Sequence, residues 1–186
     1  MFKSLFTVLL FIACFPASAV EFTLVTAKGY VRFAVPDEWI VLNMNTKPPV
    51  SVAAFQVPNP ADEGTPHSTN VALTLFHVET ERGRAAVSSV GKAYSPKPPV
   101  VSTLEGWTIY TQEAKQEGTT YSIIDAKKPC ADVVVALRFA WPHLSSDPRG
   151  YDKSTSIAFE ALRHSVTSGL GTPEPRAGEV VRRQAQ

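Results

Sequence analysis

Apolar and polar residues alternate along much of the chain after residue 20, with the period of two that is typical of β-strands. The pattern is strongest over residues 132–141, where one face carries only large apolar residues: Val133, Val135, Leu137, Phe139 and Trp141. The opposite face is also mostly apolar and carries a single charge, Arg138. A strand that is apolar on nearly both sides is expected at the centre of a sheet.

The remaining β-rich runs are shorter and are separated by turn residues. They predict strands at 22–27, 30–35, 39–44, 50–57, 70–78, 107–115 and 119–127. Gln116-Glu117-Gly118 is predicted to close a hairpin between the last two. The tetrapeptide Lys-Pro-Pro-Val occurs at residues 47 and 97, and we interpret both copies as loops that lead into strands.

Two segments have helical periodicity instead. Thr80-Glu81 has the features of a helix start, and one helical face follows it, made of Ala86, Val87, Val90 and Tyr94. The second helix is expected to start at Asp152 or Ser154, with an inward face of Ile157, Ala158, Ala161, Leu162 and Val166. The fold class predicted is therefore α+β, with a mostly antiparallel sheet and two helices.

The first residues predict export. Lys3 precedes an apolar run at 5–13 that is too short to span a bilayer, which needs about 20 residues. Ala17-Ser18-Ala19 predicts cleavage after Ala19 and a periplasmic protein. The overlapping Ile12-Ala13-Cys14 leaves an alternative, in which Cys14 is lipidated and the chain is anchored in the cell envelope.

Composition limits the classes of partner. The chain has 18 Lys and Arg and 17 Asp and Glu, so removing Lys3 with residues 1–19 leaves a neutral protein. Neutrality argues against binding to nucleic acid or an anionic membrane through a diffuse field. Residues 20–168 are expected to form one domain and residues 169–186 a disordered tail. The oligomeric state stays open.

The segment Tyr-Val-Arg-Phe-Ala-Val-Pro-Asp-Glu-Trp at 30–39 places Pro36-x-x-Trp39 directly after a strand. This motif and the order of elements resemble the PsbP-like domain family over about residues 22–167, although Glu38 stands where that family commonly has glycine. The resemblance implies an α/β/α sandwich. It also implies a protein that binds other proteins, because the family carries no common catalytic set.

Candidate chemistry is sparse. The pair His77-x-Glu79 lies on one strand face, but two ligands are too few for a metal site. Cys130, the lone cysteine after cleavage, is interpreted as inert packing, with a reactive thiol or an intermolecular link as alternatives. No cofactor or metal is predicted. An enzyme that uses His77 or Cys130 is the minor hypothesis.

Binding residues are the better candidates. Arg138 is expected to pair with Asp125 or Glu113, or otherwise to meet an acidic group of a partner. Trp107 and Tyr121 are interpreted as a cross-strand aromatic pair or as interface anchors, and Trp141 and His143 mark a second candidate surface. The function predicted is an exported, non-enzymatic protein-binding protein, for example an immunity or accessory protein for a secreted bacterial effector. The alternative is an envelope lipoprotein, anchored at Cys14, with a structural role.

Overall fold

The computed structural model describes residues 19–57, 69–143, 148–174 and 179–182. The predicted lipidation site at Cys14 and all but the last residue of the predicted signal peptide lie outside these ranges. The described part contains two helices and two sheets and is mostly antiparallel, which confirms the α+β class.

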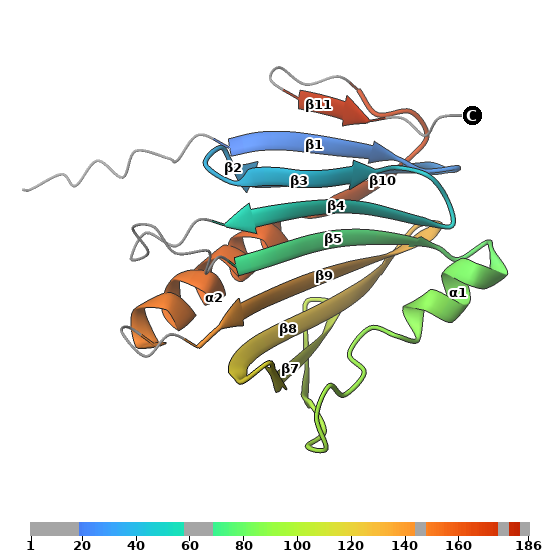
Figure 1. The fold of residues 1–186 in the computed structure, drawn as a ribbon. Helices are drawn as coiled ribbons and strands as arrows, with labels where there is room; N and C mark the ends of the chain where they lie inside the picture. Colours follow the sequence, from blue (N-terminus) through green and yellow to red (C-terminus); the bar gives the residue numbers. More distant parts are fainter. Residues whose placement is uncertain (1–18, 58–68, 144–147, 175–178, 183–186) are drawn as a thin grey trace, which may run out of the picture.

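The larger sheet has seven antiparallel strands in the order β3-β4-β5-β9-β8-β7-β6 (Figure 1). Their bounds are β3 Ile40–Asn45, β4 Val50–Val57, β5 Thr69–His77, β6 Val100–Leu104, β7 Trp107–Gln116, β8 Thr119–Cys130 and β9 Val133–Pro142. β9 lies between β5 and β8, so the strand that is apolar on both faces is central, as predicted. Strands β4 and β6 begin at Val50 and Val100, directly after the two Lys-Pro-Pro loops.

The smaller sheet has the order β10-β2-β1-β11. Its strands are β1 Ala19–Val25, β2 Gly29–Pro36, β10 Thr167–Leu170 and β11 Glu179–Arg182. β11 runs parallel to β1 and places Val180 beside Phe22. The expected disordered tail at 169–186 therefore contributes strands, because Val180 adds apolar packing to the core that the surrounding polar residues do not suggest.

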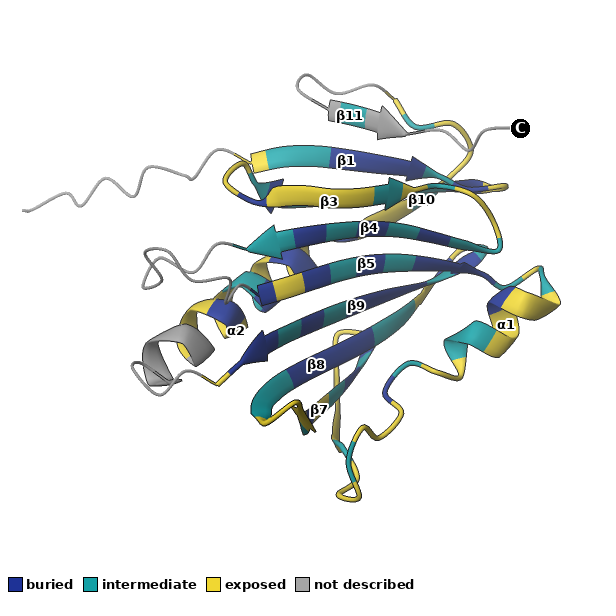
Figure 2. Ribbon diagram, in the orientation of Figure 1, coloured by how far each residue is buried: buried dark blue, intermediate teal, exposed yellow. Residues whose placement is uncertain are grey.

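The core lies between one face of the seven-stranded sheet and a layer made of the smaller sheet and α2, Pro148–Ser165 (Figures 1 and 2). Phe22 and Phe33 of the smaller sheet stack at 5.3 Å, and the Phe22 ring is 5.7 Å from that of Phe55 on β4. Phe139 of β9 meets Phe159 of α2 edge-on at 5.5 Å. These aromatic contacts join both sheets and the helix into one core.

The inward face of α2 differs from the prediction. Thr155, Phe159, Leu162 and the following Val166 are buried, whereas Ile157 and Ala161 are exposed. The helix also begins before the expected cap, at Pro148. Phe159 brings more apolar area to the core than Ile157 and Ala161, so burying its ring sets the rotation of the helix.

The first helix is short. α1 spans Glu81–Val87 and starts as predicted, because the hydroxyl of Thr80 accepts a hydrogen bond from the N–H of Gly83. It ends well before Tyr94, since Gly91 has φ +76° and lies against the ring of Tyr110, where a Cβ would come within 2.4 Å. The chain after α1 then crosses over β7 and β8 in place of the expected longer helix.

Candidate functional site

The face of the seven-stranded sheet opposite α2 carries small side chains along a row that crosses its strands. Ala54 of β4 lies opposite Ala72 of β5, which lies opposite Arg138 of β9, which lies opposite Asp125 of β8. Residues directly opposite each other in antiparallel strands share a face. We call this surface the open face. Along this row the two alanines are followed by an ion pair, and Tyr110 of β7 lies opposite Asp125.

Arg138 is held on the open face by three contacts. Its Nε and Nη2 donate to the two carboxylate oxygens of Asp125 at 2.7 and 3.1 Å. Its guanidinium lies 5.1 Å from the ring centre of Tyr94 and donates to the Tyr94 hydroxyl. The hydrogen bonds to Asp125 raise the pKa of Arg138. The carboxylate is buried, but 43% of the Arg138 side chain is exposed.

The position of Tyr94 is fixed by a buried amide on β7. Gln112 accepts a hydrogen bond from the backbone N–H of Tyr94 and donates one to the carbonyl of Lys92, both at 2.9 Å. These bonds hold the segment after α1 above the sheet. A cleft of about 160 Å³ lies between this segment and the sheet, with Ser89 and Val90 on one side and Thr74 and Arg138 on the other.

A larger cleft of about 640 Å³ lies at the far end of β7. β6 pairs only with residues 107–111 of β7, so the next residues of β7 continue beyond it. The cleft runs along that continuation, from Gln112 to Lys115, and residues 95–98 form its other wall. Proline at 96 and 98 has no N–H to donate, which explains why this wall does not pair with β7.

The structure separates the predicted binding residues. Arg138 pairs with Asp125 as predicted, while Glu113 lies opposite Ser122, on the other face. Trp107 and Trp141 are only 2% and 4% exposed, so both are core residues. This agrees with the packing interpretation of Trp107 and contradicts surface anchoring by either residue.

Tyr121 and His143 lie nearer the surface. Tyr121 lies opposite Ala114 and is partly buried, so it does not form the expected aromatic pair with Trp107. His143 is exposed, and its Nε2 is hydrogen-bonded to the Ser122 hydroxyl at 2.6 Å. Of the five predicted residues, Arg138 and His143 reach the surface with a side-chain hydrogen bond.

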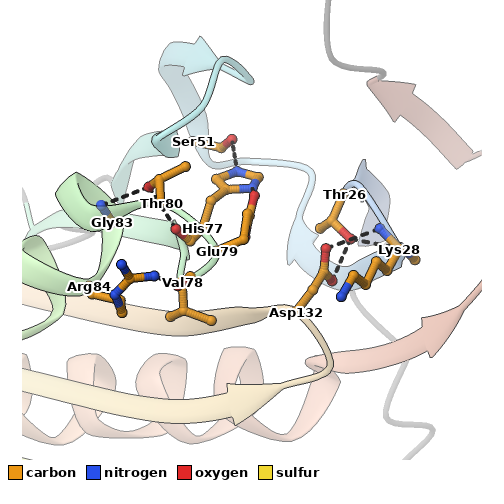
Figure 3. Close-up of polar contacts among 11 residues, drawn as sticks. Thr26, Lys28, Ser51, His77, Val78, Glu79, Thr80, Gly83, Arg84 and Asp132 are labelled. Atoms are coloured by element: carbon orange, nitrogen blue, oxygen red, sulfur yellow. Dashed lines mark hydrogen bonds and ion pairs between the residues drawn. The ribbon is translucent and has the colours of Figure 1, made fainter.

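A second polar arrangement surrounds His77 at the end of β5 (Figure 3). The Oγ of Ser51 is hydrogen-bonded to Nε2 of His77 at 3.0 Å, and Nδ1 lies 3.5 Å from a carboxylate oxygen of Glu79. Serine, histidine and carboxylate in this order resemble the relay of a hydrolase. The sequence indicated His77 and Glu79 but not Ser51, which the β4–β5 pairing alone brings near.

The exposure of Ser51 and His77 determines whether a substrate can reach them. Ser51 is 2% exposed and His77 is fully buried, and neither residue lines the two clefts described above. The carbonyl of His77 also accepts a hydrogen bond from the Thr80 hydroxyl at 2.9 Å, which ties it to the start of α1. A nucleophile must reach its substrate. The hydrogen bonds of Ser51 and His77 join β4, β5 and the start of α1.

Other reactive groups are also inaccessible or dispersed. Cys130 is buried, and burial raises the pKa of its thiol, which disfavours the reactive thiolate. Within the described ranges, no three His, Cys, Asp or Glu side chains gather in a way that would hold a metal ion. No helix of the described ranges is long and apolar enough to cross a membrane.

Comparison with known proteins gives little. No protein-family model matches the chain, so the PsbP-like resemblance stays a prediction, and no curated protein matches it either. Among solved structures, the chain is similar to LpqN, described as involved in cell envelope biogenesis of Mycobacterium tuberculosis. The TM-score is 0.43 and the identity 13%, over 81% of this chain and 91% of that chain. Values this low do not bear on function.

Proposed function

We propose that this chain is an exported protein that binds another protein through the open face and carries out no chemistry of its own. The observation that carries the proposal is Arg138, whose guanidinium is fixed in orientation while 43% of the side chain stays exposed. Export rests on the signal-like segment at residues 1–19.

The surroundings of Arg138 favour recognition of a carboxylate. Asp125 occupies Nε and Nη2, while no hydrogen bond from Nη1 is found within the described residues. A planar guanidinium that is already oriented loses little further freedom on binding, and arginine is the usual partner of carboxylates in interfaces. The flanking alanines of β4 and β5 let a partner approach closely. We infer a partner that inserts an acidic side chain beside Tyr94.

The finer proposal is an immunity or accessory protein for a secreted effector. A protein with this role acts where the effector arrives, which an export signal supports, and it acts by occluding the effector. An acidic contact group on the effector would match Arg138. This role also requires no catalytic residues.

Site-specific crosslinking tests the proposed surface. We would place a photoreactive amino acid at Thr74, beside Arg138 on the open face, and at Ile157, which is exposed on α2 on the other side of the sheet. The proposal expects a protein adduct in intact cells from position 74 and none from position 157. Equal adducts from both positions, or none from position 74, would contradict it.

Substitution of Arg138 then tests the contact group. Arg138→Gln is expected to weaken binding of the crosslinked partner by about 30-fold or more, as for an interface hot spot. Arg82→Gln removes a nearby exposed charge on α1 and is the matched control, expected to bind normally. Urea unfolding of Arg138→Gln confirms that the variant is folded. Normal binding by the folded variant would refute the role of Arg138.

The lipoprotein alternative rests on Cys14. A mass spectrum of the native N-terminus distinguishes cleavage after Ala19 from lipidation. Cleavage after Ala19 is expected to give a free Val20, and the lipoprotein alternative a diacylated Cys14. Cleavage after Ala19 removes only the first residue of β1 and keeps Val20 paired with Val35. The fold therefore accommodates the cleavage that we propose.

A further inference from the structure

The edge strand β3 is exposed and apolar. Ile40, Val41 and Leu42 are 52%, 49% and 55% exposed, and β3 is the last strand on its side of the seven-stranded sheet (Figure 2). Proteins usually protect such an edge with charged residues or proline inside the strand. The sequence of β3, Ile-Val-Leu-Asn-Met-Asn, contains neither. An edge strand without charge or proline can pair with another strand.

A bulge in β3 sets which residues share a face. The register against β4 shifts between Val41 and Asn43, so Leu42 is the extra residue. Val41 lies opposite Phe55 and Met44 opposite Ala53, which places Val41 and Met44 on the core-side face. By the same register, Ile40 and Asn45 lie on the open face.

We propose that two copies of this chain pair through β3, antiparallel, about a two-fold axis that passes between Leu42 and Asn43. In this register Val41 of one copy faces Met44 of the second copy, and Ile40 faces Asn45. Each pair then joins residues of the same face, as antiparallel pairing requires. The two bulges also coincide at the axis, so neither strand has an unmatched residue.

The charged residues that flank β3 favour a second copy of the chain as its pairing partner. Glu38 lies two residues before the strand and Lys47 two residues after it, and both are exposed. The same axis places Glu38 of each copy beside Lys47 of the second copy, so one register gives two opposite-charge contacts. Neither side chain forms an ion pair within the part of the chain that the structure describes. A second copy therefore covers the apolar edge of β3 and also supplies an opposite charge at each end of the strand.

Charge reversal tests the register. Glu38→Lys and Lys47→Glu each place like charges at both contacts, and each is expected to raise the dimer dissociation constant roughly ten- to a hundredfold. The double variant restores opposite charges and is expected to return the constant to within a few-fold of wild type. Analytical ultracentrifugation over a dilution series measures the dissociation constant of the wild type and of each variant. Leu170→Lys, on the exposed strand β10, is the control that leaves the dimer unchanged.

Disulfide trapping provides an independent measurement. The double variant Val41→Cys with Met44→Cys is expected to give a covalent dimer on mild oxidation. Val41→Cys alone is not, since its two cysteines would lie about 10 Å apart, beyond disulfide reach. A wild-type protein that stays monomeric at 0.1 mM (about 2 mg/mL), a double charge variant that is not rescued, or trapping by the single cysteine would overturn the proposal. None of these results depends on Arg138, so this interface and the proposed function fail separately.

Discussion

Replacing Ser51 with alanine tests whether its contact with His77 is a structural bond or part of a reactive centre. The change removes the hydroxyl and leaves Nε2 of His77 buried without its 3.0 Å partner. Nδ1 of the same ring is already buried with no hydrogen bond within the described residues. In the variant, neither ring nitrogen has a hydrogen bond, and the polar contact that remains is with Glu79, whose carboxylate oxygen lies 3.5 Å from Nδ1.

The expected cost follows from that burial. Leaving a buried polar group unsatisfied costs about 1–3 kcal/mol, which for a domain of this size lowers the melting temperature by about 2–4 °C per kcal/mol. The chain offers a matched control in Ser122→Ala, because Ser122 makes the same type of bond to His143 at an exposed position. Water replaces the lost hydroxyl there, so we expect a change below about 0.5 kcal/mol.

Urea unfolding of the three proteins, followed by tryptophan fluorescence, measures both effects. A fluorophosphonate probe added to the native wild type supplies the chemical readout, and we expect no label on Ser51 because its hydroxyl is enclosed. Labelling of Ser51, together with unchanged stability of Ser51→Ala, would refute the structural assignment and support an enzyme.

Three further predictions concern the core, the thiol and acid stability. Phe139→Ala removes a fully buried ring and is expected to cost about 3–5 kcal/mol in urea unfolding, whereas a cost below 1 kcal/mol would contradict the described core. Cys130 is expected to react with Ellman's reagent at pH 8 far more slowly in native protein than in urea, and equal rates would show an accessible thiol. The hydrogen bond from Arg163 holds the pKa of Glu105 below its usual 4.5, so this contact stabilises the fold above pH 4.5 and its contribution is lost as pH falls through the lowered pKa. Glu105→Gln is expected to flatten the fall of the urea midpoint between pH 5 and 3, and an unchanged slope would rule out this contribution.

The sequence predicts the strands well where period-two alternation is strong. β9 is central as its two apolar faces indicate, and the turn at Glu117-Gly118 has positive φ at both residues, as a tight hairpin requires. β11 could not be foreseen, because its four residues gain their order from pairing with β1 at the other end of the chain. Long-range pairing of this kind leaves no local pattern in the sequence.

The candidate site was also predictable from the sequence only in part. Charge inside an apolar strand predicted that Arg138 pairs with Asp125 or Glu113, since a partly buried guanidinium requires a partner, and the fold selects Asp125. Residue type alone did not separate Trp107 and Trp141 from surface aromatics, because tryptophan is common in both cores and interfaces. Ser51 meets His77 only through sheet register, so its role is visible only in the folded chain.

The parallel pair of β1 and β11 affects how the protein folds. It joins Glu21 to Glu179, so the outer edge of β1 stays uncovered for the interval before two segments far apart in the sequence come together. During that interval the outer edge of β1 is available to other chains, which is a recognised route to aggregation. A protein truncated before residue 179 keeps this edge uncovered permanently. β11 therefore covers the outer edge of β1 in the smaller sheet.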